Sequence, residues 1–89
     1  METKHKKVLI ADDEPDILEI LKYNLTNEGY EVVTAKDGDE ALEKAKLTQP
    51  DLIILDVMMP RKTGVEVCKL LRAQDAFKET LIIFLTAVN

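Results

Sequence analysis

Several residue types that mark whole classes of protein are scarce or missing here. Cys68 is the only cysteine, so no disulfide can form within the chain, and we expect an intracellular, cytoplasmic location. The sequence has no serine, which excludes a Ser-His-Asp triad. Its three glycines form neither a G-x-x-x-x-G-K-[ST] phosphate loop nor a G-x-G-x-x-G dinucleotide fingerprint. The chemistry must therefore be sought in other side chains.

Long apolar runs and excess positive charge are also missing. No run approaches the roughly 20 residues of a membrane span, so we expect no membrane contact. The first apolar run is too short for a signal peptide. Seventeen acidic residues against 12 Lys and Arg give a net charge of −5, which argues against direct nucleic-acid binding by this segment. The length of 89 residues, with 46% hydrophobic and 33% charged residues, indicates one globular domain.

What the sequence does contain is an alternation of short apolar runs and helical patterns. Val8–Ala11, Leu52–Leu55 and Leu81–Leu85 are apolar throughout, as in parallel strands buried on both faces. Glu31–Ala35 is more polar and suits an edge strand. The order is β-α-β-α-β-α-β, and right-handed crossovers would make this a doubly wound parallel α/β sheet.

Helix boundaries can be predicted from the same segments. Pro15 suits the first turn of a helix, and Gly29 supplies its stop. Two pairs of residues have capping-box spacing: Asp37 with Glu40, and Thr63 with Glu66. We interpret the Leu, Val and Cys positions on the three helices, including Cys68, as core.

Polar residues gather where the apolar runs end. Asp12 and Asp13 follow the first run, Asp56 follows the third and Thr86 follows the fourth. Ligands of open α/β sheets bind beyond the carboxyl ends of the strands, where the strand order reverses. With the order 2-1-3-4, this point lies between the first and third strands, and the three carboxylates meet there. A divalent cation, Mg²⁺ or Mn²⁺, would offset their repulsion.

This cluster has both a chemical and a simpler interpretation. With a cation bound, a carboxylate oxygen of Asp56 could attack phosphorus and form an aspartyl phosphate, with the Thr86 hydroxyl donating to a phosphoryl oxygen. Alternatively, Asp12 or Asp13 could cap the first helix. Asp56 could be a turn residue and Thr86 an ordinary strand residue. The conjunction of all four favours the chemical interpretation.

The segments VLIADDEPDILEIL, PDLIILDVMMPRKTGVEVCKLLR and IIFLTA resemble the receiver domain of two-component response regulators. The resemblance extends from Lys7 onward and implies a flavodoxin-like fold. It also implies that Asp56 accepts a phosphoryl group from a sensor histidine kinase in a Mg²⁺-dependent reaction. A change of conformation would then control an output, often transcription. Such a domain is not an enzyme and at most catalyses its own phosphorylation and dephosphorylation.

The resemblance implies roles for individual residues. Four would supply metal ligands: the carboxylates of Asp12, Asp13 and Asp56 and the backbone carbonyl of Met58. Two match the switch hydroxyl and its neighbour at the phosphate: Thr86 and Ala87. Two match the loop and helix start that follow the phosphoacceptor: Pro60 and Gly64. We interpret the neighbouring Arg61 and Lys62 as solvated loop charges.

Receiver domains continue with a fifth strand, which ends in a lysine that contacts the phosphoryl group. The sequence ends at Asn89. We therefore expect residues 1–89 to form a receiver domain that is incomplete at its C-terminal end. The apolar strand Leu81–Leu85 would become an exposed edge, which predicts a homodimer or a swapped oligomer joined there.

Two further hypotheses compete with the phosphoacceptor module. The chain could be a metal-binding half-domain or an assembly fragment. Its phosphotransfer would then be impaired because the strand-5 lysine is absent. It could also be a small phosphatase with an aspartyl nucleophile. The phosphatase is disfavoured because the acids after the first strand run Asp12, Asp13, Glu14, without the spacing that such an enzyme needs.

Overall fold

The computed structural model describes residues 6–86 and contains the expected alternation of strands and helices. The strands are β1 (Lys7–Ala11), β2 (Glu31–Ala35), β3 (Leu52–Asp56) and β4 (Leu81–Leu85). The helices are α1 (Pro15–Asn27), α2 (Gly38–Thr48), α3 (Gly64–Arg72) and the short 3₁₀ helix η1 (Asp75–Phe77). The four strands match the three apolar runs and the more polar segment predicted as an edge strand, and only η1 was not predicted from the sequence.

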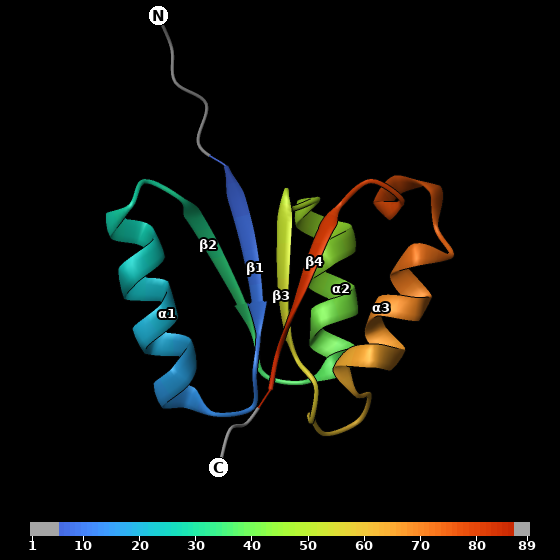
Figure 1. Cartoon of the computed structure of the whole chain (residues 1–89), viewed down its shortest axis with the longest axis horizontal. Helices are drawn as coiled ribbons and strands as arrows, with labels where there is room; N and C mark the ends of the chain where they lie inside the picture. Colours follow the sequence, from blue (N-terminus) through green and yellow to red (C-terminus); the bar gives the residue numbers. More distant parts are fainter. Residues whose placement is uncertain (1–5, 87–89) are drawn as a thin grey trace, which may run out of the picture.

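All strand pairs are parallel, and the sheet order is β2-β1-β3-β4. The predicted order 2-1-3-4 is therefore confirmed. In Figure 1 the four strands run side by side, with their carboxyl ends together at the lower edge. Ala11 at the end of β1 is paired with Leu55 near the end of β3. The strand order reverses between these two strands, so that residues just beyond them share one end of the sheet.

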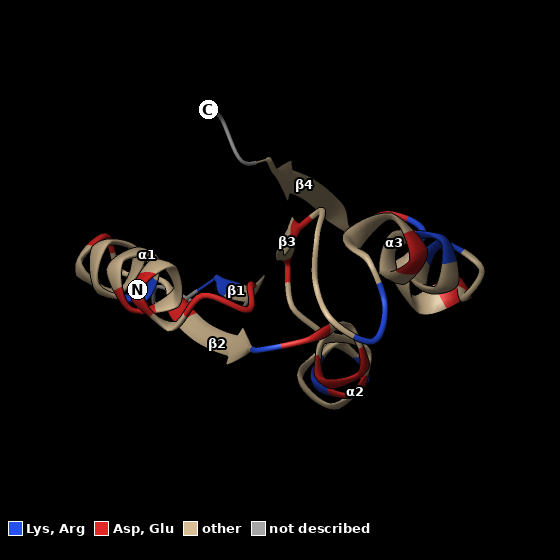
Figure 2. Ribbon diagram, turned by 90° about the horizontal axis from the view of Figure 1, so that it is seen from below, with Lys and Arg blue, Asp and Glu red and all other residues tan. Residues whose placement is uncertain are grey.

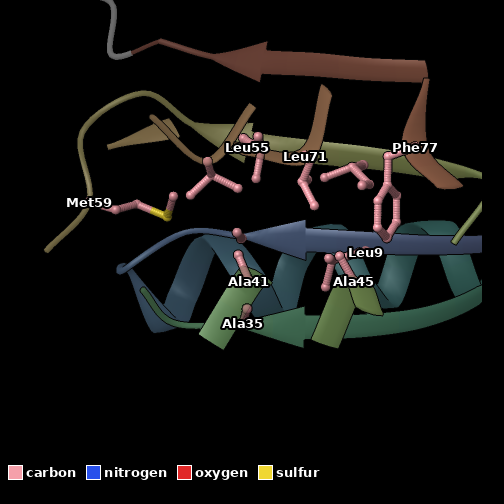
Figure 3. Close-up of a cluster of buried hydrophobic side chains, with 11 residues drawn as sticks. Leu9, Ala35, Ala41, Ala45, Leu55, Met59, Leu71 and Phe77 are labelled. Atoms are coloured by element: carbon pink, nitrogen blue, oxygen red, sulfur yellow. The ribbon is translucent and has the colours of Figure 1, made fainter. Parts of the chain in front are cut away.

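The helices are divided between the two faces of the sheet (Figure 2). Helix α1 lies on one face, over β1 and β2, while α2 and α3 pack against each other on the opposite face. The main core lies beneath α2 and α3. Figure 3 shows Leu9 and Leu55 of the sheet facing Ala41 and Ala45 of α2, with Leu71 and Phe77 beside them. The small alanines let α2 lie close to the strands.

The prediction that the Leu, Val and Cys positions of the helices are core is confirmed only in part, because Leu47 of α2 and Val65 and Leu70 of α3 are exposed. Val67 and Leu71 of α3 are fully buried, whereas Cys68 is only half-buried against the core. Helix α1 has no buried residue, and Ile17 is exposed. The reason is that α1 covers β1 and β2 only, so one flank of the helix borders an open groove over β3 and β4.

Local contacts explain where the helices begin and end. Thr63 and Glu66 form a complete capping box at α3. At α2, the Asp37 carboxylate accepts the Glu40 N–H, but the Glu40 carboxylate accepts from Lys36 rather than from Asp37. The predicted box at α2 is therefore only half formed. Gly29, with φ of 97°, follows α1 as predicted.

Strand β4 forms an edge of the described sheet, where it pairs only with β3. Leu81 is 60% exposed, and Ile83 and Phe84 are 44% and 39% exposed. Its apolar sequence suggested burial on both faces, but within residues 6–86 this strand presents apolar side chains to solvent, as expected for the edge. No helix in residues 6–86 is long and apolar enough to cross a membrane.

Candidate functional site

Three carboxylates meet at the carboxyl edge of the sheet. Asp12 and Asp13 directly follow β1, and Asp56 is the last residue of β3. One carboxylate oxygen from each lies within 4.8 Å of the others. Figure 2, which looks onto this edge, shows acidic residues in the chain leaving β1 and at the end of β3. The predicted convergence of these three side chains is confirmed.

Asp12 is held most firmly of the three. Its side chain is buried, with only 5% of the residue exposed. Its backbone N–H donates to the Ala35 carbonyl at 3.1 Å, and its Oδ1 accepts the Glu14 N–H at 2.9 Å. The N-cap of α1 is Glu14, which makes no side-chain cap bond. The simpler interpretation of Asp12 or Asp13 as the N-cap residue is therefore wrong.

Asp56 has an environment that disfavours its charge. Burial raises the pKa of its carboxyl group, and the negative charges of Asp12 and Asp13 raise this pKa further. A hydrogen bond from the Met58 N–H to Oδ1, at 3.3 Å, acts in the opposite direction. This bond also gives Asp56 the turn geometry of the simpler interpretation. The donor set is entirely oxygen and acidic, which suits a hard divalent cation such as Mg²⁺.

An open groove lies beside the carboxylates, between α1 and the end of β4. It is lined by Asp12, Asp13, Asp56, Met58, Leu85 and Thr86, and by apolar residues of α1. Thr86 is exposed and lies on the same groove as the acids, as predicted. Ala87 lies outside the described residues. The groove therefore brings a hydroxyl to the side of the acidic cluster that faces solvent.

In the loop of residues 57–63, after β3, neighbouring side chains differ in burial. Met58 is 72% exposed at the groove, whereas Met59 reaches into the core. The Lys62 N–H donates to the Pro60 carbonyl at 2.8 Å across Arg61, which has φ of 72°. This is a γ-turn with a left-handed central residue, a strained conformation for a residue with a side chain.

Gly64 fixes the base of this loop. Its N–H donates to the Val57 carbonyl at 2.9 Å. A Cβ at this position would overlap the Asp56 carbonyl oxygen and lie 3.2 Å from Val57 Cα. Only glycine allows α3 to begin this close to the end of β3. The predicted helix start at Gly64 is confirmed, and the geometry explains why glycine occupies it.

The loop also contacts α2, which sequence reasoning missed. Arg61 pairs with Asp37 at 3.7 Å, and Lys62 pairs with Asp39 at 2.9 Å. The hydrogen bond and charge of Asp39 raise the pKa of Lys62. Arg61 is exposed, as expected for a solvated loop charge, whereas Lys62 is half-buried, and each has an acidic partner that the sequence did not indicate. No local pattern signals a contact between residues so far apart in sequence.

Comparison with known proteins agrees with this geometry. The sequence profile of the response regulator receiver domain matches residues 8–89. The chain is 57% identical over 70 residues to the alkaline phosphatase synthesis transcriptional regulatory protein PhoP of Bacillus subtilis, covering 79% of the chain. It is 49% identical over all 89 residues to the probable transcriptional regulator ycf27 of Cyanophora paradoxa. It spans only 29% and 36% of the lengths of these relatives.

Solved structures share the fold. The chemotaxis response regulator CheY4 of Vibrio cholerae superposes with a TM-score of 0.92 at 44% identity, over 97% of this chain and 72% of that one. The response regulator TrrA of Thermotoga maritima, solved in complex with Mg²⁺-BeF, superposes with a TM-score of 0.86 at 46% identity, over 94% of this chain and 71% of that one. Together with the acids at the ends of β1 and β3, these matches show that the chain belongs to the response regulator receiver domain family.

Proposed function

We propose that Asp56 is the phosphoacceptor of this receiver and takes its phosphoryl group from a sensor histidine kinase. The observation that carries the proposal is the set of three carboxylate oxygens within 4.8 Å of one another at one end of the sheet. Asp56 is the member with a raised pKa and also lines the open groove. It therefore combines an acidic environment with access for a donor.

The carboxylates of Asp12, Asp13 and Asp56, together with the Met58 backbone carbonyl, would hold Mg²⁺ or Mn²⁺. When bound, the cation offsets the negative charge that gathers between the carboxylates and the phosphoryl oxygens. Asp12 is held in place by its bonds to the backbone at Ala35 and Glu14. The response regulator TrrA was solved in complex with Mg²⁺-BeF, which supports the same ligand class here.

In the reaction, an Asp56 carboxylate oxygen attacks phosphorus. The new O–P bond forms as the P–N bond to the donor imidazole breaks, and the leaving nitrogen keeps the electron pair. The Thr86 hydroxyl donates to a phosphoryl oxygen and moves toward it as the switch. Ala87, assigned to the same contact, lies outside the described residues. The Pro60 and Gly64 segment fixes the loop that carries Met58. Phosphorylation and its reversal proceed with no enzyme activity beyond this self-catalysis.

The receiver domain profile matches residues 8–89, and the relatives named above suggest transcription as the output. With a net charge of −5, this segment would not bind nucleic acid itself. We propose a cytoplasmic location, because Cys68 is the only cysteine and no disulfide can form within the chain. The exposed apolar edge at Leu81, Ile83 and Phe84 supports self-association of the 89-residue chain through β4.

The experiment is incubation of the purified chain with Mg²⁺ and acetyl phosphate, followed by intact-mass and peptide mass spectrometry. We expect one added phosphoryl group, on Asp56. Asp56→Asn should abolish the addition, because an amide oxygen is a poor nucleophile. Asp51→Asn makes the same chemical change at the opposite end of β3 and should leave the addition intact. Metal binding without any phosphorylation would overturn the proposal in favour of a metal-binding half-domain.

A further inference from the structure

The N-terminus of α2 touches the loop of residues 57–63 at several points, although it contributes no residue to the acidic cluster. The Gly38 N–H donates to the Pro60 carbonyl at 3.3 Å. This is the same carbonyl that accepts the Lys62 N–H inside the γ-turn. The Arg61–Asp37 and Lys62–Asp39 ion pairs flank the bond on the surface.

The backbone contact at Gly38 is too close for any other residue. A Cβ there would overlap the Lys62 carbonyl oxygen and lie 2.5 Å from Lys62 Cβ and 2.9 Å from the Lys62 carbonyl carbon. Two of these atoms are backbone, so the loop could not give way by a side-chain rotation alone. Gly38 has no positive φ that would itself require glycine. The requirement arises from the packing of α2 against the loop.

The opposite end of the loop is fixed in a similar way. Gly64 brings the start of α3 against the Asp56 and Val57 backbone. Met58 lies between these two fixed points and is itself 72% exposed. Its own side chain is therefore poorly placed to hold its backbone. The Met58 N–H bond to Asp56 Oδ1 and the buried neighbour Met59 restrain it in part, and the two glycine contacts fix the loop on either side.

We propose that the N-terminus of α2, through Gly38 and the Asp39–Lys62 pair, is a positioning element that sets the Met58 backbone for cation binding. This inference rests on the proposed cation site and assigns a positioning role to Gly38, which lies outside that site. Alanine is a better helix former than glycine, so Gly38→Ala at an unobstructed helix start would be harmless or favourable. Here it must push the loop away from α2, and the Met58 carbonyl with it.

The test is Mn²⁺ binding to the purified 89-residue chain, measured as free Mn²⁺ by electron paramagnetic resonance. Gly38→Ala should weaken Mn²⁺ binding by about 10- to 100-fold, the range found when groups that hold metal ligands are removed. Binding is measured at a temperature where circular dichroism shows wild type and variant to be equally folded. An unchanged dissociation constant in Gly38→Ala would overturn the inference.

Gly29→Ala is the matched control. Gly29 has φ of 97° at the far end of α1, so alanine there is strained and lowers stability without any clash in space. We expect Gly29→Ala to melt earlier than wild type yet bind Mn²⁺ with wild-type affinity. If it weakens binding as much as Gly38→Ala does, the effect reflects general stability, and the positioning role is refuted.

A second variant avoids any risk to folding. Lys62→Gln removes a positive charge near the site, so charge alone would tighten cation binding, whereas loss of the pair with Asp39 should weaken it by about two- to fivefold. Lys36→Gln removes an exposed positive charge after β2, at the same edge of the sheet, and should only tighten binding. Equal tightening in both variants would overturn the inference. Failure of wild type to bind Mn²⁺ would instead refute the cation site itself.

Discussion

Asp56 is under opposing influences in the metal-free protein. Burial and the charges of Asp12 and Asp13 favour its protonated form, whereas the Met58 N–H favours its carboxylate. Proteins tolerate such a conflict mainly where a ligand resolves it. Since the raised pKa reflects free energy lost when Asp56 ionises in the folded state, the same conflict should be visible in the stability of the protein.

The pH dependence follows from the raised pKa of Asp56. Folded Asp56 binds its proton more tightly than unfolded Asp56, so the free energy of unfolding falls as pH rises through the folded pKa. The loss of unfolding free energy is complete above the folded-state pKa of Asp56. It is absent below the unfolded-state pKa of about 3.9. Without metal, Asp56→Asn should therefore be more stable than wild type at neutral pH.

Thermal melts of wild type and Asp56→Asn in EDTA, from neutral pH down to about pH 4, measure this difference. The gap in melting temperature should close as the pH falls. Asp51→Asn, which removes a carboxylate that accepts the Lys7 N–H far from the cluster, should not be stabilised at any pH. A gap that widens toward acid would contradict the raised pKa.

Asp13 is the exposed member of the cluster, and its replacement tests cation binding without disturbing the core. Excess Mg²⁺ should raise the melting temperature of wild type, because a ligand of the native state stabilises it by about 2.7 kcal/mol at 100 times its dissociation constant. Asp13→Ala should lose most of this shift. Equal shifts in both proteins, measured by calorimetry, would place the cation elsewhere.

At the scale of elements, helix α3 contributes to the site through its N-terminal end, where a capping box adjoins the loop after Asp56. The Thr63 hydroxyl accepts the Glu66 N–H at 3.1 Å, and the Glu66 carboxylate accepts the Thr63 N–H at 2.9 Å. These two bonds join the last residue of the loop after Asp56 to the first turn of α3. They stabilise the helix where its backbone N–H groups would otherwise lack partners within the helix.

Thr63→Ala should lower the free energy of unfolding by about 1 kcal/mol, because it removes the cap. This corresponds to a fall of about 4–8 °C in melting temperature for a domain of this size. Thr26→Ala is the control, since Thr26 is an exposed residue within α1 where alanine favours the helix. Equal melting temperatures for Thr63→Ala and wild type would mean that the cap contributes nothing.

The strands could be predicted because apolar runs are a local signal, and the acidic cluster followed once the parallel order 2-1-3-4 was assumed. Apolar runs mark the strands, and parallel order places Asp13 and Asp56 at one edge. Helix η1 and the burial of Phe77 were missed, because an isolated aromatic residue in a polar segment has no periodicity. The Gly38 contact was missed for another reason: it joins two segments that meet only once the sheet is assembled.

At the scale of the whole molecule, the two faces of the sheet differ. The face under α2 and α3 holds the main core, whereas within residues 6–86 the opposite face is covered by α1 over β1 and β2. Ile17 and Ile20 of α1 are exposed beside this uncovered part, and the edge strand β4 also exposes Leu81, Ile83 and Phe84. Exposed apolar groups beside an unpaired strand edge favour association with another chain.

We expect the 89-residue chain to form dimers or larger oligomers at micromolar concentration, as measured by sedimentation equilibrium. Ile83→Lys should shift the population toward monomer, because a charge on an edge strand opposes strand pairing. Leu47→Lys replaces an even more exposed residue on α2 and should leave the association unchanged. A wild-type monomer with cooperative unfolding would refute association through β4.

The pairing of β1 with β3 has a consequence for the order of events in folding. Asp12 and Asp56 share a site only after these strands align, and β2 with two helices lies between them in the chain. Closing such a long loop is slow, so a site for the cation forms late. Bound Mg²⁺ should therefore slow unfolding and leave the folding rate nearly unchanged. Stopped-flow measurements with and without Mg²⁺ would reveal a faster folding limb if the strands instead pair before the transition state.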